Sequence, residues 1–423
     1  MKFTAWLPAS RRRDPQAPLS FDGARRRVLH AGLAAAAALA IALPAAPPAW
    51  AATPFDPDAV VTWSAPMVSA APTDANRINN QTVRQITHIS IGGSRVRVKL
   101  SNRWGPLPLA IGGAQVALRT SGENIDAATS RPLTFSGSPT FNLPAGAELL
   151  SDWVDLPVAD FADLAVDLYL PGDTSATGSV LTVRNGALQT NYVSPAGNFV
   201  GAAALPIAST RLQYNFLAAV DVVSAGKRGA VVAFGDSITE GLRSTANANA
   251  RWPDVLARRL TPTARMGVAN QGISGNRVAQ GGGSTNPSAL ARMDRAVIVQ
   301  TGATHVILLL GINDANGGTS AEDIIAAIQQ VVVRARTQQL KIFVGTVTPF
   351  GNATDAVEAR RLAINQWIRT TPEIDGVVDF DLAIRDPANP RRMLPIYDSG
   401  DTLHPSDAGY EAMGNAVDLN LFR

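Results

Sequence analysis

Apolar and polar side chains alternate along much of the chain between residues 52 and 225. In "RVRVKLSN" (95–102) the apolar residues fall at every second position, and "DLAVDLYL" (163–170) repeats this pattern. A period of two is typical of strands with one buried face. Clusters of glycine, serine and proline separate these runs, and no long helical pattern interrupts them. The pattern predicts a β-rich accessory domain over 52–225, with a sandwich or jelly-roll-like fold.

The pattern changes near residue 226, where continuous apolar runs begin to alternate with stretches of helical periodicity. Continuous apolar runs are typical of parallel strands that are buried on both faces. Ser320 and Asp323 resemble a capping box at the start of one helical stretch. We therefore expect an α/β domain over 226–423, with three layers, a parallel sheet and any ligand at the carboxyl ends of its strands. The expected strands are 230–234, 266–269, 305–310, 341–347 and 376–380.

The first 51 residues differ in composition from the rest of the chain. A basic segment precedes "AGLAAAAALAIAL" (31–43), an apolar stretch that is too short to span a membrane. Ala49 and Ala51 frame a small-residue cleavage signal, and "RRRVLH" (25–30) resembles a twin-arginine motif. We expect an export signal over 1–51 that directs the chain to the periplasm or outside the cell, without stable membrane insertion after cleavage. An uncut membrane anchor is the alternative.

Charge and cysteine content exclude several classes of function. The formal net charge of the 423-residue chain is +3, but residues 1–51 hold seven of the 37 basic and two of the 34 acidic side chains, so the remainder has a net charge of −2. This balance gives no support to nucleic-acid binding. The chain has no cysteine, which excludes disulfides, thiol nucleophiles and cysteine-ligated metals. Nothing in the sequence requires a metal or an organic cofactor.

Three loops at the ends of predicted strands carry residues that can take part in catalysis. "AVVAFGDSITEG" presents Ser237 where a helix begins, and a hydroxyl there acts as a nucleophile if a base accepts its proton. "VANQGISGNRV" contains Gly272 and Gly275, whose backbone N–H groups can approach a ligand closely. "LLLGINDANGG" contains Asn313, whose side-chain amide can donate to an oxyanion. Each loop alone also has a structural explanation as a turn or a helix cap.

The late stretch "DTLHPSDAGY" supplies a candidate base. Asp401 lies three residues before His404 and can hold one tautomer of its imidazole, which leaves the other nitrogen free to accept a proton from Ser237. The other histidines are poorer candidates. His30 belongs to the expected leader, His88 to a predicted strand, and His305 to the strand end opposite these loops.

These four blocks, in this order, resemble the SGNH (GDSL-type) hydrolase superfamily, which implies a flavodoxin-like three-layer fold with a parallel sheet. The resemblance covers 229–423 and implies that Ser237 is the nucleophile, His404 the general base and Asp401 the residue that orients it. It implies an oxyanion hole formed by the Ser237 N–H, the Gly275 N–H and the Asn313 side chain, with Gly275 preferred over Gly272. The implied reaction is hydrolysis of a carboxylic ester through an acyl-serine intermediate.

Upstream segments, including "TWSAP" and "ADLAVDLYLPG", resemble a secreted two-domain subgroup described as similar to a xylan-associated arylesterase or acylhydrolase. This resemblance favours short acyl esters, especially acetyl esters on a plant-type polysaccharide. One alternative is a general arylesterase or lipase. A second alternative is an acyltransferase, and an alternative from another class of function is an inactive carbohydrate-binding protein.

Overall fold

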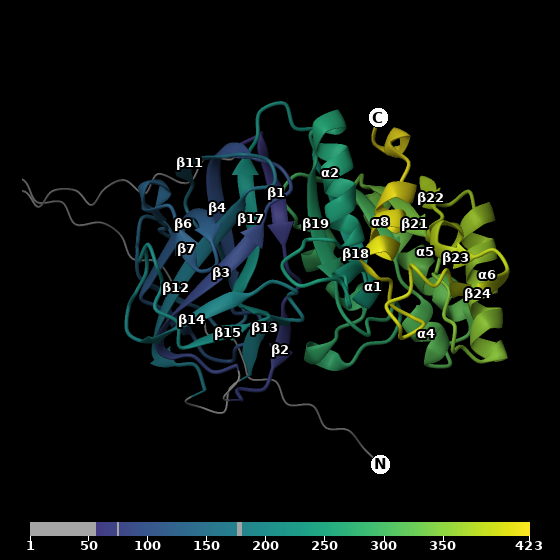
Figure 1. Ribbon diagram of the computed structural model, residues 1–423, viewed down its shortest axis with the longest axis horizontal. Coiled ribbons are helices and arrows are strands. Elements are labelled where there is room, and N and C mark those ends of the chain that lie inside the picture. The colour runs from purple at the N-terminus through teal and green to yellow at the C-terminus, as the bar shows by residue number, and fades with distance from the viewer. Residues whose placement is uncertain (1–55, 74–75, 176–179) are drawn as a thin grey trace, which may run out of the picture. The chain divides into compact units, whose positions relative to one another are not determined.

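The computed structural model describes residues 56–423, apart from 74–75 and 176–179. The expected export signal over 1–51 lies outside the described residues. The described part belongs to one compact unit, in which short strands come first and a mixture of strands and helices follows (Figure 1).

The region before residue 225 is rich in antiparallel β-structure, as its alternating pattern predicts. Two larger sheets have the orders β1-β17-β4-β10 and β15-β14-β3-β12-β6-β7, with β11 added to β4 and β8 to β6, while β16-β13-β2 and β5-β9 form smaller sheets. The bounds are β1 Ala59–Ser64, β2 Val68–Ala70, β3 Asn79–His88, β4 Gly93–Ser101, β5 Leu109–Ile111, β6 Gly113–Ser121, β7 Asn124–Ile125, β8 Arg131–Pro132, β9 Phe141–Leu143, β10 Glu148–Leu150, β11 Val154–Val158, β12 Asp163–Asp173, β13 Leu181–Asn185, β14 Asn191–Ala196, β15 Ser209–Arg211, β16 Gln213–Asn215 and β17 Leu217–Val223.

The two strands predicted from alternation both lie inside sheets. The first is β4, which pairs with β17 on one side and buries Val96, Val98 and Leu100 completely. The second is β12, which lies between β3 and β6. Apolar side chains on these strands join the main core, because alternate residues of a strand face the same side.

A parallel sheet with the order β19-β18-β20-β21-β22 forms the centre of the second region. Its strands are β18 Ala230–Gly235, β19 Gly267–Gly272, β20 Ala303–Leu309, β21 Lys341–Gly345 and β22 Gly376–Val378, and a short hairpin pairs β23 Arg385–Asp386 with β24 Asn389–Met393. The helices are α1 Ser237–Glu240, α2 Trp252–Ala264, α3 Ala289–Met293, α4 Ile312–Asn316, α5 Ala321–Thr337, α6 Asp355–Thr370, α7 Phe380–Ile384 and α8 Asp407–Ala416.

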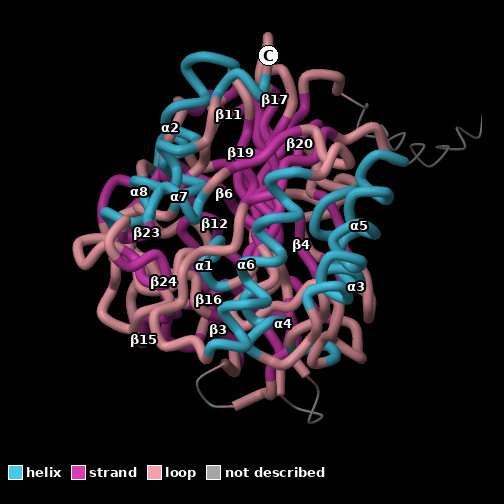
Figure 2. Tube along the Cα trace, turned by 90° about the vertical axis from the view of Figure 1, so that its right-hand side faces the viewer, coloured by secondary structure: helices cyan, strands magenta, loops and turns pink. Residues whose placement is uncertain are grey.

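Helices pack on both faces of this parallel sheet. Val231 and Ala233 of β18 belong to a buried cluster with residues of α2, α7 and α8. Val232 and Phe234 face the other way, into a cluster that includes residues of α3, α5 and α6. Figure 2 shows α2, α7 and α8 to one side of the strands and α3 and α5 to the other. Burial of both faces explains the continuous apolar runs in the sequence.

The last parallel strand is shorter than the sequence predicts. The apolar pattern predicts 376–380, but β22 ends at Val378. Asp379 then accepts a hydrogen bond from the Leu382 N–H and caps α7, so Phe380 is helical. The strand ends here because the Asp379 side chain satisfies a backbone donor of α7, which allows the helix to begin at Phe380. At α5, Ser320 accepts a hydrogen bond from the Asp323 N–H, as expected for an N-cap.

The β-rich region packs directly against the parallel sheet. Strand β1 lies against β19, and the Val61 N–H donates to the Thr301 carbonyl over 2.9 Å. Gly267 allows this approach, because a Cβ there would lie 2.1 Å from the Val61 carbonyl oxygen. The main apolar core runs without interruption from β1 and β17 into β18 and α5.

Candidate active site

Ser237 lies at the point where β18 gives way to α1. The Asp236 side chain accepts a hydrogen bond from the Ile238 N–H and caps this single helical turn, which begins with Ser237. Gly235 is needed here for space, since a Cβ would lie 2.1 Å from Thr239 Oγ1. Ser237 is 5% exposed. The serine thus lies at the start of a single helical turn, where backbone N–H groups without a helical partner favour developing negative charge.

His404 and Asp401 form a continuous hydrogen-bonded chain with this serine. His404 Nε2 lies 2.9 Å from Ser237 Oγ, and His404 Nδ1 lies 2.8 Å from Asp401 Oδ2. An ionised carboxylate only accepts hydrogen bonds, so Nδ1 carries the proton and Nε2 faces the serine hydroxyl as an acceptor. The structure thus brings together the three residues that the sequence proposes for this role.

Asp401 is held in its ionised form. Burial alone would raise its pKa, but hydrogen bonds from the backbone and imidazole of His404 and from the Leu403 N–H keep the pKa of this carboxyl well below its ordinary value. The largely exposed Arg243 also lies near, with Nε 3.3 Å from Asp401 Oδ2.

The two backbone N–H groups that the sequence proposes as oxyanion donors are not used in other hydrogen bonds of the described structure. Among the described residues, no acceptor is found for the N–H of Ser237 or Gly275. Gly275 has a φ of +69°, a conformation that favours glycine, in the loop after β19. The Gly272 N–H already donates to Asn270 Oδ1 over 2.9 Å. These contacts favour Gly275 over Gly272 as the second donor.

Asn313 lies in the first turn of α4 and is oriented by two acceptors. Its Nδ2 lies 3.0 Å from the Asn276 carbonyl oxygen and 3.4 Å from Asp236 Oδ2. The next residue, Asp314, is buried and accepts the Val278 N–H over 2.9 Å. The Asn-Asp pair therefore ties α4 to the loop that carries Gly275 and does not cap a helix.

Asp236 has an unusual electrostatic environment for a carboxyl group. Burial raises its pKa to about 7, and the nearby carboxylates of Asp314 and Glu240 act in the same direction. The hydrogen bond from the Ile238 N–H and the charge of Arg292 oppose this rise. The residue beside the serine can therefore change its charge near neutral pH.

Arg292 supports the site although no sequence motif marks it. Its guanidinium donates to the carbonyl oxygens of Gly235 and Gln271, each over 2.8 Å, and to Asn276 Oδ1 over 2.9 Å. It therefore joins the ends of β18 and β19 to the segment that carries Asn276. Burial, with the nearby charge of Arg184, lowers the pKa of Arg292 to about 9. Arg292 lies within the short helix α3, where the sequence gives no sign of a functional role.

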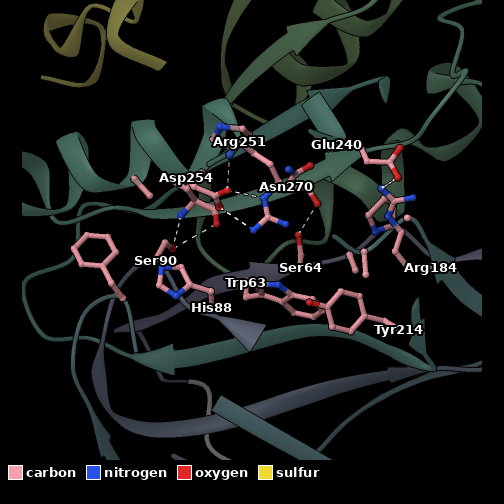
Figure 3. Close-up of a pocket in the computed structure, with 18 residues that line it drawn as sticks. Trp63, Ser64, His88, Ser90, Arg184, Tyr214, Glu240, Arg251, Asp254 and Asn270 are labelled. Atoms are coloured by element: carbon pink, nitrogen blue, oxygen red, sulfur yellow. Dashed lines mark hydrogen bonds and ion pairs between the residues drawn. The ribbon is translucent and has the colours of Figure 1, made fainter. Parts of the chain in front are cut away.

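A second group of residues that the sequence does not single out links the β-rich region to α1, the helical turn that carries Ser237. Arg184 of β13 forms a buried ion pair with Glu240 of α1, with 2.7 Å between Nη2 and Oε1. Figure 3 shows the two side chains pointing toward each other at one end of a pocket. The other Glu240 oxygen accepts a hydrogen bond from Ser274, the neighbour of Gly275. One carboxylate thus contacts both the β-rich region and the proposed oxyanion loop.

In the described part of the chain, no group of three or more histidine and acidic side chains is placed to hold a metal ion. No helix among the described residues is both long enough and apolar enough to cross a membrane.

Part of the chain is similar to known proteins. Residues 233–412 match the GDSL-like lipase/acylhydrolase family. An uncharacterised esterase of Bacillus subtilis is 33% identical over 132 residues, which cover 28% of this chain and 34% of that protein. The chain therefore spans about a third of the length of this curated relative.

Solved structures also resemble part of the chain. A G-D-S-L family protein from Desulfitobacterium hafniense is 24% identical, with a TM-score of 0.37, over 45% of this chain and 97% of that one. An acetyl-xylooligosaccharide esterase from Geobacillus is 22% identical, with a TM-score of 0.36, over 45% and 93% of the two chains. The family match, and the motifs that it contains, show that this chain carries a domain of the GDSL-like lipase/acylhydrolase (SGNH) family.

Proposed function

We propose that this protein is a serine esterase that hydrolyses short-chain carboxylic esters, most of all acetyl esters on a plant-type polysaccharide. The observation that carries the proposal is the hydrogen-bonded chain from Ser237 Oγ through His404 to Asp401. A serine, a base and a carboxylate in this order form the arrangement used for acyl transfer.

The reaction follows from the positions of these groups. Ser237 Oγ attacks the ester carbonyl carbon while His404 Nε2 takes the hydroxyl proton. The carbonyl oxygen becomes an oxyanion, which the N–H groups of Ser237 and Gly275 and the Asn313 amide stabilise. His404 then gives its proton to the leaving alcohol, and the acyl-serine remains. Water, deprotonated by His404, attacks the acyl carbon, the bond to Ser237 Oγ breaks, and His404 returns the proton to Oγ as the acid leaves.

The substrate class is the finer part of the proposal. Its support is the β-rich region beside the catalytic domain and the resemblance of upstream segments to xylan-associated members of the superfamily. Export by the twin-arginine route belongs to the same proposal, because a polysaccharide substrate lies outside the cytoplasm.

Acetate release from acetylated xylan tests both parts of the proposal. We expect release by the protein and none by Ser237→Ala, while Ser209→Ala, which changes an exposed serine of β15, behaves like the unmodified protein. Cleavage of small aryl acetates through Ser237 without release from xylan would favour the arylesterase alternative. Absence of both activities in the folded protein would contradict the esterase proposal.

A further inference from the structure

A cavity of about 490 Å³ lies where β4 and neighbouring loops of the β-rich region face β19, α3 and the segment after α3. Small-molecule sites typically have volumes of about 300–1,000 Å³. The cavity is therefore large enough for a ligand of the size of a sugar. Ser237, His404 and Asp401 do not line it, so it is distinct from the candidate active site.

Positive charge predominates in the wall of this cavity. Four cationic side chains line it, against a single carboxylate, that of Glu148. The four are Lys99, Arg103, Arg292 and Arg295. Glu148 accepts a hydrogen bond from Ser101 Oγ over 2.8 Å, and no carboxylate in the described part of the chain lies within ion-pair distance of these four cations.

Several polar groups in the wall have no hydrogen-bond or ion-pair partner in the described part of the chain. Lys99 is 9% exposed, and among the described residues its ammonium, which is not fully buried, has no acceptor. The Nε of Arg103 and the Oε1 of Gln300 are buried and unbonded in the described structure. Leaving these two buried groups unpaired is costly. An anionic group would pair with Lys99 and Arg103, and a ligand hydroxyl would donate to Gln300.

The remaining wall offers contacts for the rest of a ligand. Trp104, Met67 and Ile273 supply an apolar surface, and Ser284 and Gln271 are among the polar lining residues. An aromatic ring beside polar groups suits a sugar, which has both apolar C–H faces and hydroxyl groups.

We propose that this cavity binds a sugar-sized organic anion, with its anionic group held by Lys99 and Arg103 and its less polar face against Trp104. The site does not depend on the esterase proposal, because none of its cations takes part in the acyl transfer described above.

Calorimetric titration of the full chain carrying Ser237→Ala tests the site without turnover. The probes are D-glucuronate, glucose 6-phosphate and uncharged D-glucose. We expect saturable binding of an anionic sugar and at least tenfold weaker binding of glucose. Binding of glucuronate would identify a carboxylate as the anionic group, and binding of glucose 6-phosphate alone would identify a phosphate.

Further substitutions in the Ser237→Ala protein show whether the ligand binds in this cavity. Lys99→Met is expected to weaken binding of the anionic sugar about tenfold or more, since it removes a charge-assisted contact. Lys341→Met, which changes an exposed lysine outside the cavity, is the matched control and should leave binding unchanged. Equal binding of glucose, no binding of either anion, or unchanged affinity in a folded Lys99→Met variant would overturn the proposal.

Discussion

At Asp401, burial and hydrogen bonding act in opposite directions on one carboxyl group, and hydrogen bonding prevails. The residue therefore stays ionised at neutral pH and keeps the proton of His404 on Nδ1. Nε2 is left to face Ser237 Oγ at 2.9 Å. The short spacing between Asp401 and His404 makes this possible, because the same carboxylate also accepts the His404 backbone N–H.

Substitution of Asn313 tests the proposed oxyanion hole. One N–H of its amide donates to the Asn276 carbonyl oxygen over 3.0 Å. The other has only a long contact of 3.4 Å to Asp236 Oδ2, and this is the N–H that would turn to the oxyanion. We expect Asn313→Ala to lower kcat for an aryl acetate by about 10²–10³ with a small change in KM. Asn316→Ala, an exposed change in the same helix, should have no effect. A kcat near that of the unmodified protein in a folded Asn313→Ala variant would rule out this role.

The raised pKa of Asp236 predicts a specific pH dependence of the free energy of unfolding. Its folded-state pKa of about 7 lies above its ordinary value of 3.8, so its contribution to stability is fully present below that ordinary value and is lost as pH rises through about 7. Asp236→Asn removes this titration. The difference in Tm between the variant and the unmodified protein should therefore grow in favour of the variant from pH 5 to pH 8. A difference that does not change with pH would contradict the prediction.

The motif residues of the site are easier to predict from the sequence than the residues that support them. Ser237, Asp401, His404, Gly275 and Asn313 stand in recognisable motifs. The structure joins Ser237, His404 and Asp401 by hydrogen bonds and places the Asn313 amide beside Asp236, the neighbour of Ser237. Arg292 and Glu240 carry no such motif, because their roles depend on which backbone carbonyls and side chains the fold places around them. Only the tertiary structure supplies that information.

At the level of elements, the parallel strands are predictable because each is buried on both faces and has a continuous apolar run. Their ends are less predictable. Strand β19 extends to Gly272 through Asn270 and Gln271, which are polar and therefore break the apolar pattern. Strand β22 stops early because Asp379 caps α7.

The packing of β19 against α1 depends on Gly272. A Cβ at this position would lie 2.2 Å from the Glu240 backbone nitrogen, so α1 or β19 must move to accept it. We expect Gly272→Ala to lower the free energy of unfolding by roughly 1–3 kcal/mol and to reduce kcat. In Gly282→Ala the nearest contact would be 3.6 Å, and this control should be nearly neutral. Equal stability of the two variants in urea unfolding would contradict the packing argument.

At the level of the whole molecule, Arg184 joins the β-rich region to α1 through Glu240 (Figure 3). We expect Arg184→Met to cost roughly 3–5 kcal/mol of stability, because it leaves the buried Glu240 carboxylate without its partner. The double variant Arg184→Met with Glu240→Gln should recover part of the stability. If the double variant is no more stable than Arg184→Met, the ion pair does not explain the loss.

The sequence predicts two kinds of secondary structure on either side of residue 226, but not how closely they are joined. The described residues of both regions share one apolar core, and β1 contacts β19 through backbone atoms. Nothing local to β1 marks this contact, because it depends on the small size of Gly267, which is distant from β1 in the sequence.

Labelling with a fluorophosphonate, followed by peptide mapping, tests directly whether Ser237 is the nucleophile. The predicted result is one labelled serine, Ser237, with labelling and aryl acetate hydrolysis both lost in Ser237→Ala and both retained in Ser209→Ala. Labelling should also slow sharply in His404→Ala, because the hydroxyl then lacks its base. Continued ester hydrolysis by a folded Ser237→Ala variant, or labelling at another serine, would contradict the proposed mechanism.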